Sequence, residues 1–185
     1  SNDRHWLSWK GNEESFLDSK IPTAYPKDDQ VVFIPFVKFG NQLKGLWEDI
    51  QLDPKEEDVL NILRETVLPN LKRIAYSKSK FMLLLEDHSE PLPIGRFGDG
   101  VIRVLGIALA LANAQDKILL IDEFESGLHH SIQETLWKLV FKYSKEWNIQ
   151  AFFTTHSKDT LTNFFYVGNN EINRNDAFFV RLQYS

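Results

Sequence analysis

The sequence contains no cysteine, and its single methionine is Met82. Without cysteine the chain forms no disulfide, no thiolate metal site and no cysteine nucleophile, which fits a reducing compartment such as the cytoplasm. The first residue is Ser1 and not methionine. We therefore expect the chain to be a fragment of a longer polypeptide, with an opening that includes an expression scar.

Long apolar runs and an excess of positive charge are also missing. No apolar run approaches the roughly 18 residues that a membrane-spanning helix needs, and no signal peptide is recognisable at the start. A net charge of -5 excludes a surface that is basic throughout, so any contact with DNA must be local. With 43% hydrophobic content, the 185 residues can bury the core of one compact domain. We expect a soluble, cytoplasmic protein with no membrane partner.

The first part of the chain, residues 1–90, is expected to form a linker, strand and helical region. Residues 1–30 predict irregular structure or a short hairpin, and residues 31–37 predict a strand that Pro35 interrupts or places at a sheet edge. A helix should start with Asp53 as its cap, Pro54 at its first position and Glu56 completing a capping box, and it should stop at Pro69.

A further strand is predicted at residues 81–85. The basic residues just before it are Lys72, Arg73, Lys78 and Lys80. Such a cluster is more often solvated surface than a nucleic-acid contact, so DNA remains the less favoured partner.

The second part, residues 91–185, has the alternating pattern of an α/β core. Residues 101–114 are apolar almost all round and predict a buried helix, and residues 118–121 predict a central parallel strand. An amphipathic helix over 132–147 and a buried strand over 151–155 follow. In such a βαβ unit both strands end at the same edge of the sheet, where these folds bind ligands.

Three polar residues follow the two predicted strands. Asp122 and Glu123 come directly after the first strand, and His156 comes after the second. A carboxylate pair after four aliphatic residues is the Walker B pattern, in which the first acid helps to hold magnesium and the second polarises the attacking water. Taken alone, the pair is equally consistent with the start of a solvated loop.

The motifs over residues 91–157 resemble those of the ABC-type P-loop ATPases. In order, they are Gly98-Asp99-Gly100 with Arg103, then ILLIDEFESGLHH and FFTTHS. They are most similar to the soluble branch that includes RecF-like repair ATPases, overcoming-lysogenization-defect (OLD) nucleases and ATPases of phage defence. The resemblance implies an α/β fold: a three-layer P-loop NTPase (ABC-ATPase-like) domain, incomplete here, with parallel core strands carrying Walker B and the switch histidine.

The resemblance also implies roles for individual residues. Asp122 would associate with Mg2+, Glu123 would be the general base, and His156 would contact the γ-phosphate of ATP. Ser126 and Gly127 would belong to the D-loop. Gly98, Asp99 and Gly100 would form the signature loop, which faces the ATP bound to an opposite subunit. This role implies a homodimer in which ATP is sandwiched between the two subunits. Independently, a glycine-flanked turn before a buried helix exposes N–H groups that suit an anion, although it could also be only a tight turn.

The sequence departs from that family at several positions. No GxxxxGK[ST] phosphate loop exists in it, so this chain alone should bind ATP poorly and hardly hydrolyse it. We expect the loop on a preceding segment, with a degenerate relative as the alternative. Arg96 lies where relatives often have a serine shortly before the glycines, and whether it substitutes is open. Transporter-like D-loops end in an aspartate, and His129 and His130 stand in its place here, as is common in the soluble branch.

These histidines raise an alternative, a metal-hydrolase site. His129, His130 and His156 with the two acids offer zinc or manganese ligands. It is disfavoured, because adjacent histidines at a helix start point in different directions and no HExxH spacing is present.

The leading functional hypothesis is an ATP-driven dimer that gates a DNA-processing or phage-defence effector. A nuclease of the OLD kind is an alternative, but only 29 residues follow His156, so its metal-binding domain or nuclease partner would have to be elsewhere. A nucleotide-sensing scaffold is another alternative, and a transporter subunit is the least favoured.

Overall fold

The computed structural model describes residues 6–10, 13–17, 30–35, 40–169, 177 and 179–180. Strands β1 (Trp6–Lys10) and β2 (Glu13–Leu17) pair antiparallel, which confirms the hairpin alternative for the start of the chain. Strand β3 (Val31–Ile34) covers the first four residues of the predicted run, and residues 36 and 37 lie outside the described part. Pro35 follows it directly and has no N–H to extend a ladder.

The central sheet consists of β3, β7 (Ile118–Ile121) and β8 (Gln150–Phe153) in the order β3-β7-β8, with both pairs parallel. Helix α4 (His130–Glu146) connects β7 to β8. The predicted βαβ unit and its parallel strands are thus confirmed, and the carboxyl ends of β7 and β8 meet at one edge.

The two faces of this sheet differ in their cover. Ile34, Leu119 and Ile121 are buried on the face that contacts α3 (Asp99–Asn113), where Trp137 of α4 also packs on Phe153 of β8. On the other face, one row across the three strands is Phe33, Leu120 and Phe152. Phe33 is 48% exposed and Phe152 is 51% exposed. The described residues therefore cover one face of the parallel sheet and leave aromatic side chains on the other.

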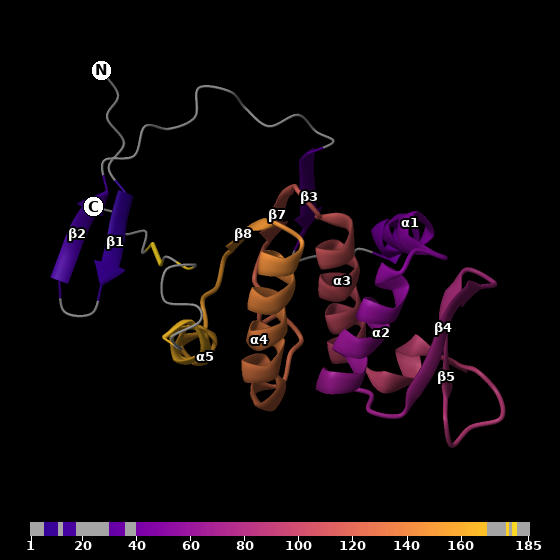
Figure 1. The fold of residues 1–185 in the computed structure, drawn as a ribbon. Helices are drawn as coiled ribbons and strands as arrows, with labels where there is room; N and C mark the ends of the chain where they lie inside the picture. Colours follow the sequence, from indigo (N-terminus) through magenta and orange to yellow (C-terminus); the bar gives the residue numbers. More distant parts are fainter. Residues whose placement is uncertain are drawn as a thin grey trace.

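Helix α3 is the centre of the helical layer. From Val104 to Ala112 its side chains are fully buried, as the apolar sequence predicted. It contacts α1 (Gly40–Ile50), α2 (Lys55–Thr66), β3 and α4, and Figure 1 shows α4, α3 and α2 side by side. Three alanines in α3 permit this close approach on several sides.

A small antiparallel sheet leads the chain into α3. It has the order β4-β5-β6, from β4 (Leu71–Ser77), β5 (Lys80–Leu85) and β6 (Leu92–Pro93), and the short 3-10 helix η2 (Ile94–Phe97) follows it. Ile74 and Leu83 are paired and buried on its inner face. The predicted strand at 81–85 is confirmed, and the basic cluster is exposed on β4 and the β4–β5 hairpin.

The start of α2 differs from the predicted capping box. Pro54 already has helical dihedral angles, and the carboxylate of Asp53 accepts the N–H of Lys55 at 2.9 Å. Glu56 accepts the N–H of Leu52 and not that of its expected partner Asp53. The predicted capping box is therefore wrong in both pairings, since it requires Asp53 to accept the N–H of Glu56 and Glu56 to accept that of Asp53.

Helices α1 and α5 (Lys158–Gly168) and strand β4 were not predicted. In the described residues, no helix combines the length and the apolar character that crossing a membrane requires.

Candidate functional site

The candidate site begins where β7 and β8 end. Asp122 and Glu123, which we call the acid pair, follow β7, and residues 154–157, which we call the histidine loop, follow β8. The Thr154 hydroxyl donates to Asp122 Oδ1 at 2.6 Å and accepts the N–H of Glu123 at 2.9 Å. The backbone of Thr154 also bonds to Ile121 and Phe124, on either side of the acid pair. One threonine therefore fixes both acids against the end of β8.

Glu123 has a backbone conformation that side chains rarely adopt. Its φ is +46°, in the left-handed region. For a residue with a Cβ this costs roughly 1 to 2 kcal/mol, and such residues cluster at functional sites where neighbours hold them in place. Here the Thr154 hydroxyl stabilises this conformation by accepting the backbone N–H of Glu123.

Arg103 ties the same edge to helix α3. Its side chain is only 4% exposed. Its guanidinium donates to the carbonyl oxygens of Asp122 at 2.7 Å, Glu123 at 2.8 Å and Pro35 at 3.2 Å. Burial lowers the pKa of Arg103, and the carboxylates of Glu125, Asp122 and Glu123 act in the opposite direction. The arginine belonged to the motif in the sequence, but its link between α3 and the acid pair was not predicted.

The glycine turn, residues 98–100, opens α3 beside the turn that follows the acid pair. Gly98 has a φ of +86°, and no described side chain caps the first turn of the helix. A Cβ on Gly100 would lie 3.0 Å from the carbonyl oxygen of Gly127. Gly127 itself has a φ of +72°, and a Cβ on it would lie 3.9 Å from Asp99. The two predicted loops thus pack backbone to backbone within one chain.

Glu125 connects the acid-pair turn to the histidine loop. Its Oε1 accepts the N–H groups of His156 at 3.0 Å and Ser157 at 3.1 Å. The side chain of His156 is exposed at the same edge, and Ser126 bonds back to the carbonyl of Glu123. The structure thus brings the predicted residues of both strand ends together.

The neighbouring histidines serve the start of α4. His129 Nδ1 lies 2.9 Å from Ser131 Oγ. It also accepts the backbone N–H of Ser131 at 3.3 Å, as a helix cap does. The rings of His129 and His130 lie against each other, with centroids 4.1 Å apart, and do not diverge as the sequence suggested. Within the part of the chain that the structure describes, no group of three or more histidine or acidic side chains could hold a metal.

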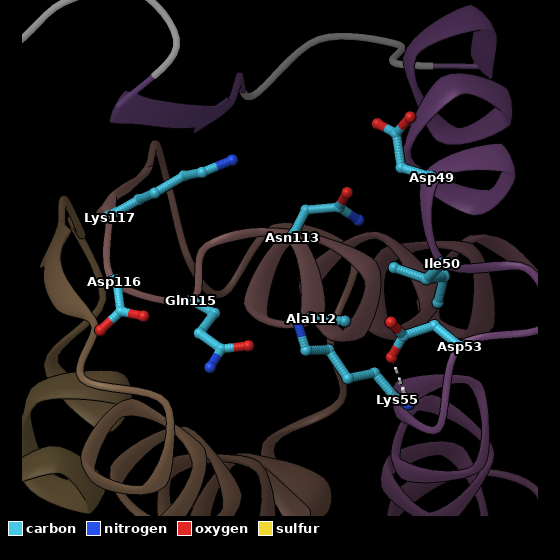
Figure 2. A pocket seen from close by; sticks show the side chains of 9 residues that line it. All are labelled: Asp49, Ile50, Asp53, Lys55, Ala112, Asn113, Gln115, Asp116 and Lys117. Carbon is cyan, nitrogen blue, oxygen red and sulfur yellow. Dashed lines mark hydrogen bonds between the residues drawn. The ribbon is translucent and has the colours of Figure 1, made fainter.

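A surface hollow lies at the opposite end of the strands (Figure 2). Lys117, which immediately precedes β7, lines it together with Asp49, Asn113 and Asp116. The acid pair follows the other end of β7, so this hollow is separate from the candidate site.

Arg96 is exposed in η2, two residues before the glycine turn.

Comparison with known proteins identifies relatives of this chain. Residues 3–163 match the family described as AAA domain, putative AbiEii toxin, Type IV TA system. An ATP/GTP phosphatase of Helicobacter pylori is 34% identical over 96 residues, which are 50% of this chain and 26% of the relative. The chain therefore spans about a quarter of that relative's length.

A solved structure from work on ATP-driven dimerisation and DNA-stimulated activation of SMC ATPases is also similar. It aligns with a TM-score of 0.46 and 14% identity, over 65% of this chain and 77% of that one. The family match covers most of the chain and agrees with the three motifs around the acid pair. The chain thus belongs to the AAA-domain family of putative AbiEii toxins, and the expected relation to ABC-type P-loop ATPases is confirmed.

Proposed function

We propose that the protein containing this chain binds ATP with Mg2+ and hydrolyses it, using the edge formed by the acid pair and the histidine loop. The observation that carries the proposal is the Thr154 hydroxyl, which bonds to both members of the acid pair. Phosphoryl transfer to water needs little covalent chemistry from a protein; it needs fixed charges and a positioned water. Two carboxylates at a strand end meet that need, one held by a hydrogen bond and the other carried on a fixed backbone.

Asp122 suits the magnesium role. Mg2+ prefers oxygen ligands and commonly takes only one or two carboxylates, completing its shell with water and phosphate oxygens. The lack of a larger acidic cluster in the described residues is compatible with this. One Asp122 oxygen accepts the Thr154 hydroxyl, so the carboxylate is oriented before any ligand arrives. Bound Mg-ATP would supply the γ-phosphoryl group and the charge that polarises it.

Glu123 is the proposed general base, and His156 the proposed contact to the γ-phosphate. As a carboxylate, Glu123 would accept a proton from the attacking water, and its fixed backbone limits where the carboxylate can reach. The exposed imidazole of His156 projects from a loop whose backbone Glu125 holds. A ring N–H of this kind is a suitable donor to a phosphate oxygen.

A complete nucleotide site needs more than these residues supply. The sequence has no GxxxxGK[ST] loop, so we propose that residues 1–185 alone bind ATP weakly and do not turn it over. The row of Phe33, Leu120 and Phe152 supports a further layer on that face, since parallel sheets are usually covered on both sides. A strand and helix carrying the phosphate loop would fit there.

We further propose that ATP joins two copies through the glycine turn and the residues around Ser126 and Gly127. The uncapped first turn of α3 offers N–H groups to an anion, and its contact with Gly127 combines both loops into one surface. Closing and reopening of such a dimer would gate an effector in phage defence or DNA processing. The family's description as a putative toxin of a Type IV toxin–antitoxin system supports an effector role of some kind.

The test is magnesium-dependent ATP turnover in the longest native polypeptide, comparing wild type with Glu123→Gln and recording mass by light scattering. Loss of the base should lower kcat by about 100-fold or more, while an ATP-dependent dimer accumulates. Glu90→Gln, at an exposed glutamate away from the acid pair, is the control and should match wild type.

Equal turnover in wild type and Glu123→Gln would remove the general-base role. If wild type neither hydrolyses ATP nor changes mass with it, the nucleotide-sensing or scaffold alternative takes the place of this proposal.

A further inference from the structure

Glu125 spans the two loops of the candidate site. It belongs to the turn after β7, two residues beyond Glu123, yet its carboxylate reaches the loop after β8. A single oxygen, Oε1, accepts two successive N–H groups, from His156 at 3.0 Å and Ser157 at 3.1 Å. Hydrogen bonds from N–H groups to an ionised acceptor are roughly twice as strong as neutral ones. The link thus joins backbone segments more than thirty residues apart.

The bonds of Glu125 act where the chain has no regular ladder of its own. Residues 154–157 lie between the end of β8 and the first residue of α5, Lys158. Ser157 then caps α5, because its Oγ accepts the N–H of Thr160 at 3.3 Å. The Ser157 N–H is shared with Thr155 Oγ1 at 3.0 Å, whereas Glu125 is the acceptor for the N–H of His156, so Glu125 acts most directly on the backbone that presents the histidine.

The surroundings of Glu125 resist its movement. Its second oxygen, Oε2, is buried and makes no hydrogen bond within the described residues. The charge of Glu125 favours the charged form of Arg103, the residue that holds the acid-pair carbonyls. A carboxylate with one oxygen bonded twice and the other enclosed cannot rotate without breaking both N–H bonds.

We infer that Glu125 is a positioning residue that keeps His156 in register with the acid pair. The inference rests on the proposed function, since it names how that same site is assembled. Glu125 need not touch the nucleotide. It acts through His156, so its removal should matter only as long as the histidine is present.

A double-mutant cycle tests this in the longest native polypeptide that contains these residues. Glu125→Ala should lower kcat about 10-fold or more with little change in KM, because small misplacement of a catalytic group is costly. In a His156→Ala background, the same change should cause no further loss. Glu134→Ala, which removes an exposed carboxylate paired with Lys138 on α4, should leave kcat unchanged.

If the losses in kcat of the two single variants multiply in the double variant, the inference is overturned, since a residue that only supports the local structure acts with or without His156. Glu125→Gln keeps an oxygen acceptor without its charge and should lose only about 3-fold, again only when His156 is present. If Glu125→Ala does not fold, the double-mutant cycle is measured with Glu125→Gln and His156→Ala instead.

A second measurement separates this inference from the proposed function. Hydrogen–deuterium exchange over residues 154–158 should be faster in Glu125→Ala than in wild type, and unchanged in Glu134→Ala. If ATP turnover is absent in wild type, the proposed function fails, and exchange still reports on the link. Unchanged exchange in Glu125→Ala would overturn the inference whatever the turnover shows.

Discussion

Replacing Arg103 by methionine is the sharpest test of how the acid pair is supported. Methionine keeps the unbranched stem and much of the volume of the side chain but removes all of its donors. The arginine is 4% exposed and donates to three carbonyl oxygens, those of Asp122, Glu123 and Pro35. These carbonyls belong to the ends of β7 and β3, so the substitution leaves both strand ends without their shared partner.

The magnitude follows from the three bonds. A hydrogen bond from a charged donor contributes about 1.5 to 3 kcal/mol, and a buried acceptor left alone costs about 1 to 3 kcal/mol. The contributions do not add, because loosened carbonyls can reach water. Three such losses, partly offset by water, come to about 3 to 5 kcal/mol, which we expect here. For a domain of this size, that is a fall in Tm of roughly 6 to 20 °C.

Urea unfolding followed by fluorescence of the tryptophans measures the change. The matched control is Arg73→Met, at an exposed arginine on β4, which should alter the free energy of unfolding by less than about 0.5 kcal/mol. If Arg103→Met is as stable as wild type, hydrophobic replacement compensates the lost bonds, and the argument that Arg103 holds the strand ends is refuted.

Two smaller changes test other contacts. Thr154→Val should lower kcat roughly 10-fold or more because both acids lose the hydroxyl that fixes them, while Thr154→Ser, which keeps it, should stay close to wild type; equal losses would contradict this. Gly100→Ala places a Cβ 3.0 Å from the Gly127 carbonyl oxygen and should destabilise by about 1 to 3 kcal/mol. Gly45→Ala, in helix α1 with open space around it, should instead stabilise the protein by about 0.5 to 1 kcal/mol. Urea unfolding measures both glycine variants, and midpoints that shift in the same direction for Gly100→Ala and Gly45→Ala would refute the comparison.

The core of the fold could be predicted because its signals are local and strong. Strand β7 coincides with the run of four aliphatic residues, and α4 follows an apolar period of three and four. Helix α1 was missed since Gly40, Asn41 and Gly45 weaken its helical propensity. Leu43, Trp47 and Ile50 do have helical spacing and are buried, so their pattern was the available signal.

The candidate site was predictable only in part. The acid pair and His156 could be placed because strand ends are readable from sequence and parallel strands share an edge. The bonds of Thr154 and Glu125 could not, since they join residues more than thirty positions apart through side-chain geometry. Arg103 offered one clue: a charged residue within an otherwise apolar helix must find polar partners when it is buried.

The exposed row on the central sheet has a practical consequence for experiments on oligomerisation. Phe33 and Phe152 are each about half exposed, and they flank Leu120. The described residues leave this apolar row open, and copies of residues 1–185 that expose it would tend to adhere to each other without any nucleotide. A dimer seen in such a preparation therefore carries no information about an ATP-driven one. What matters is whether association appears with ATP and disappears after its hydrolysis.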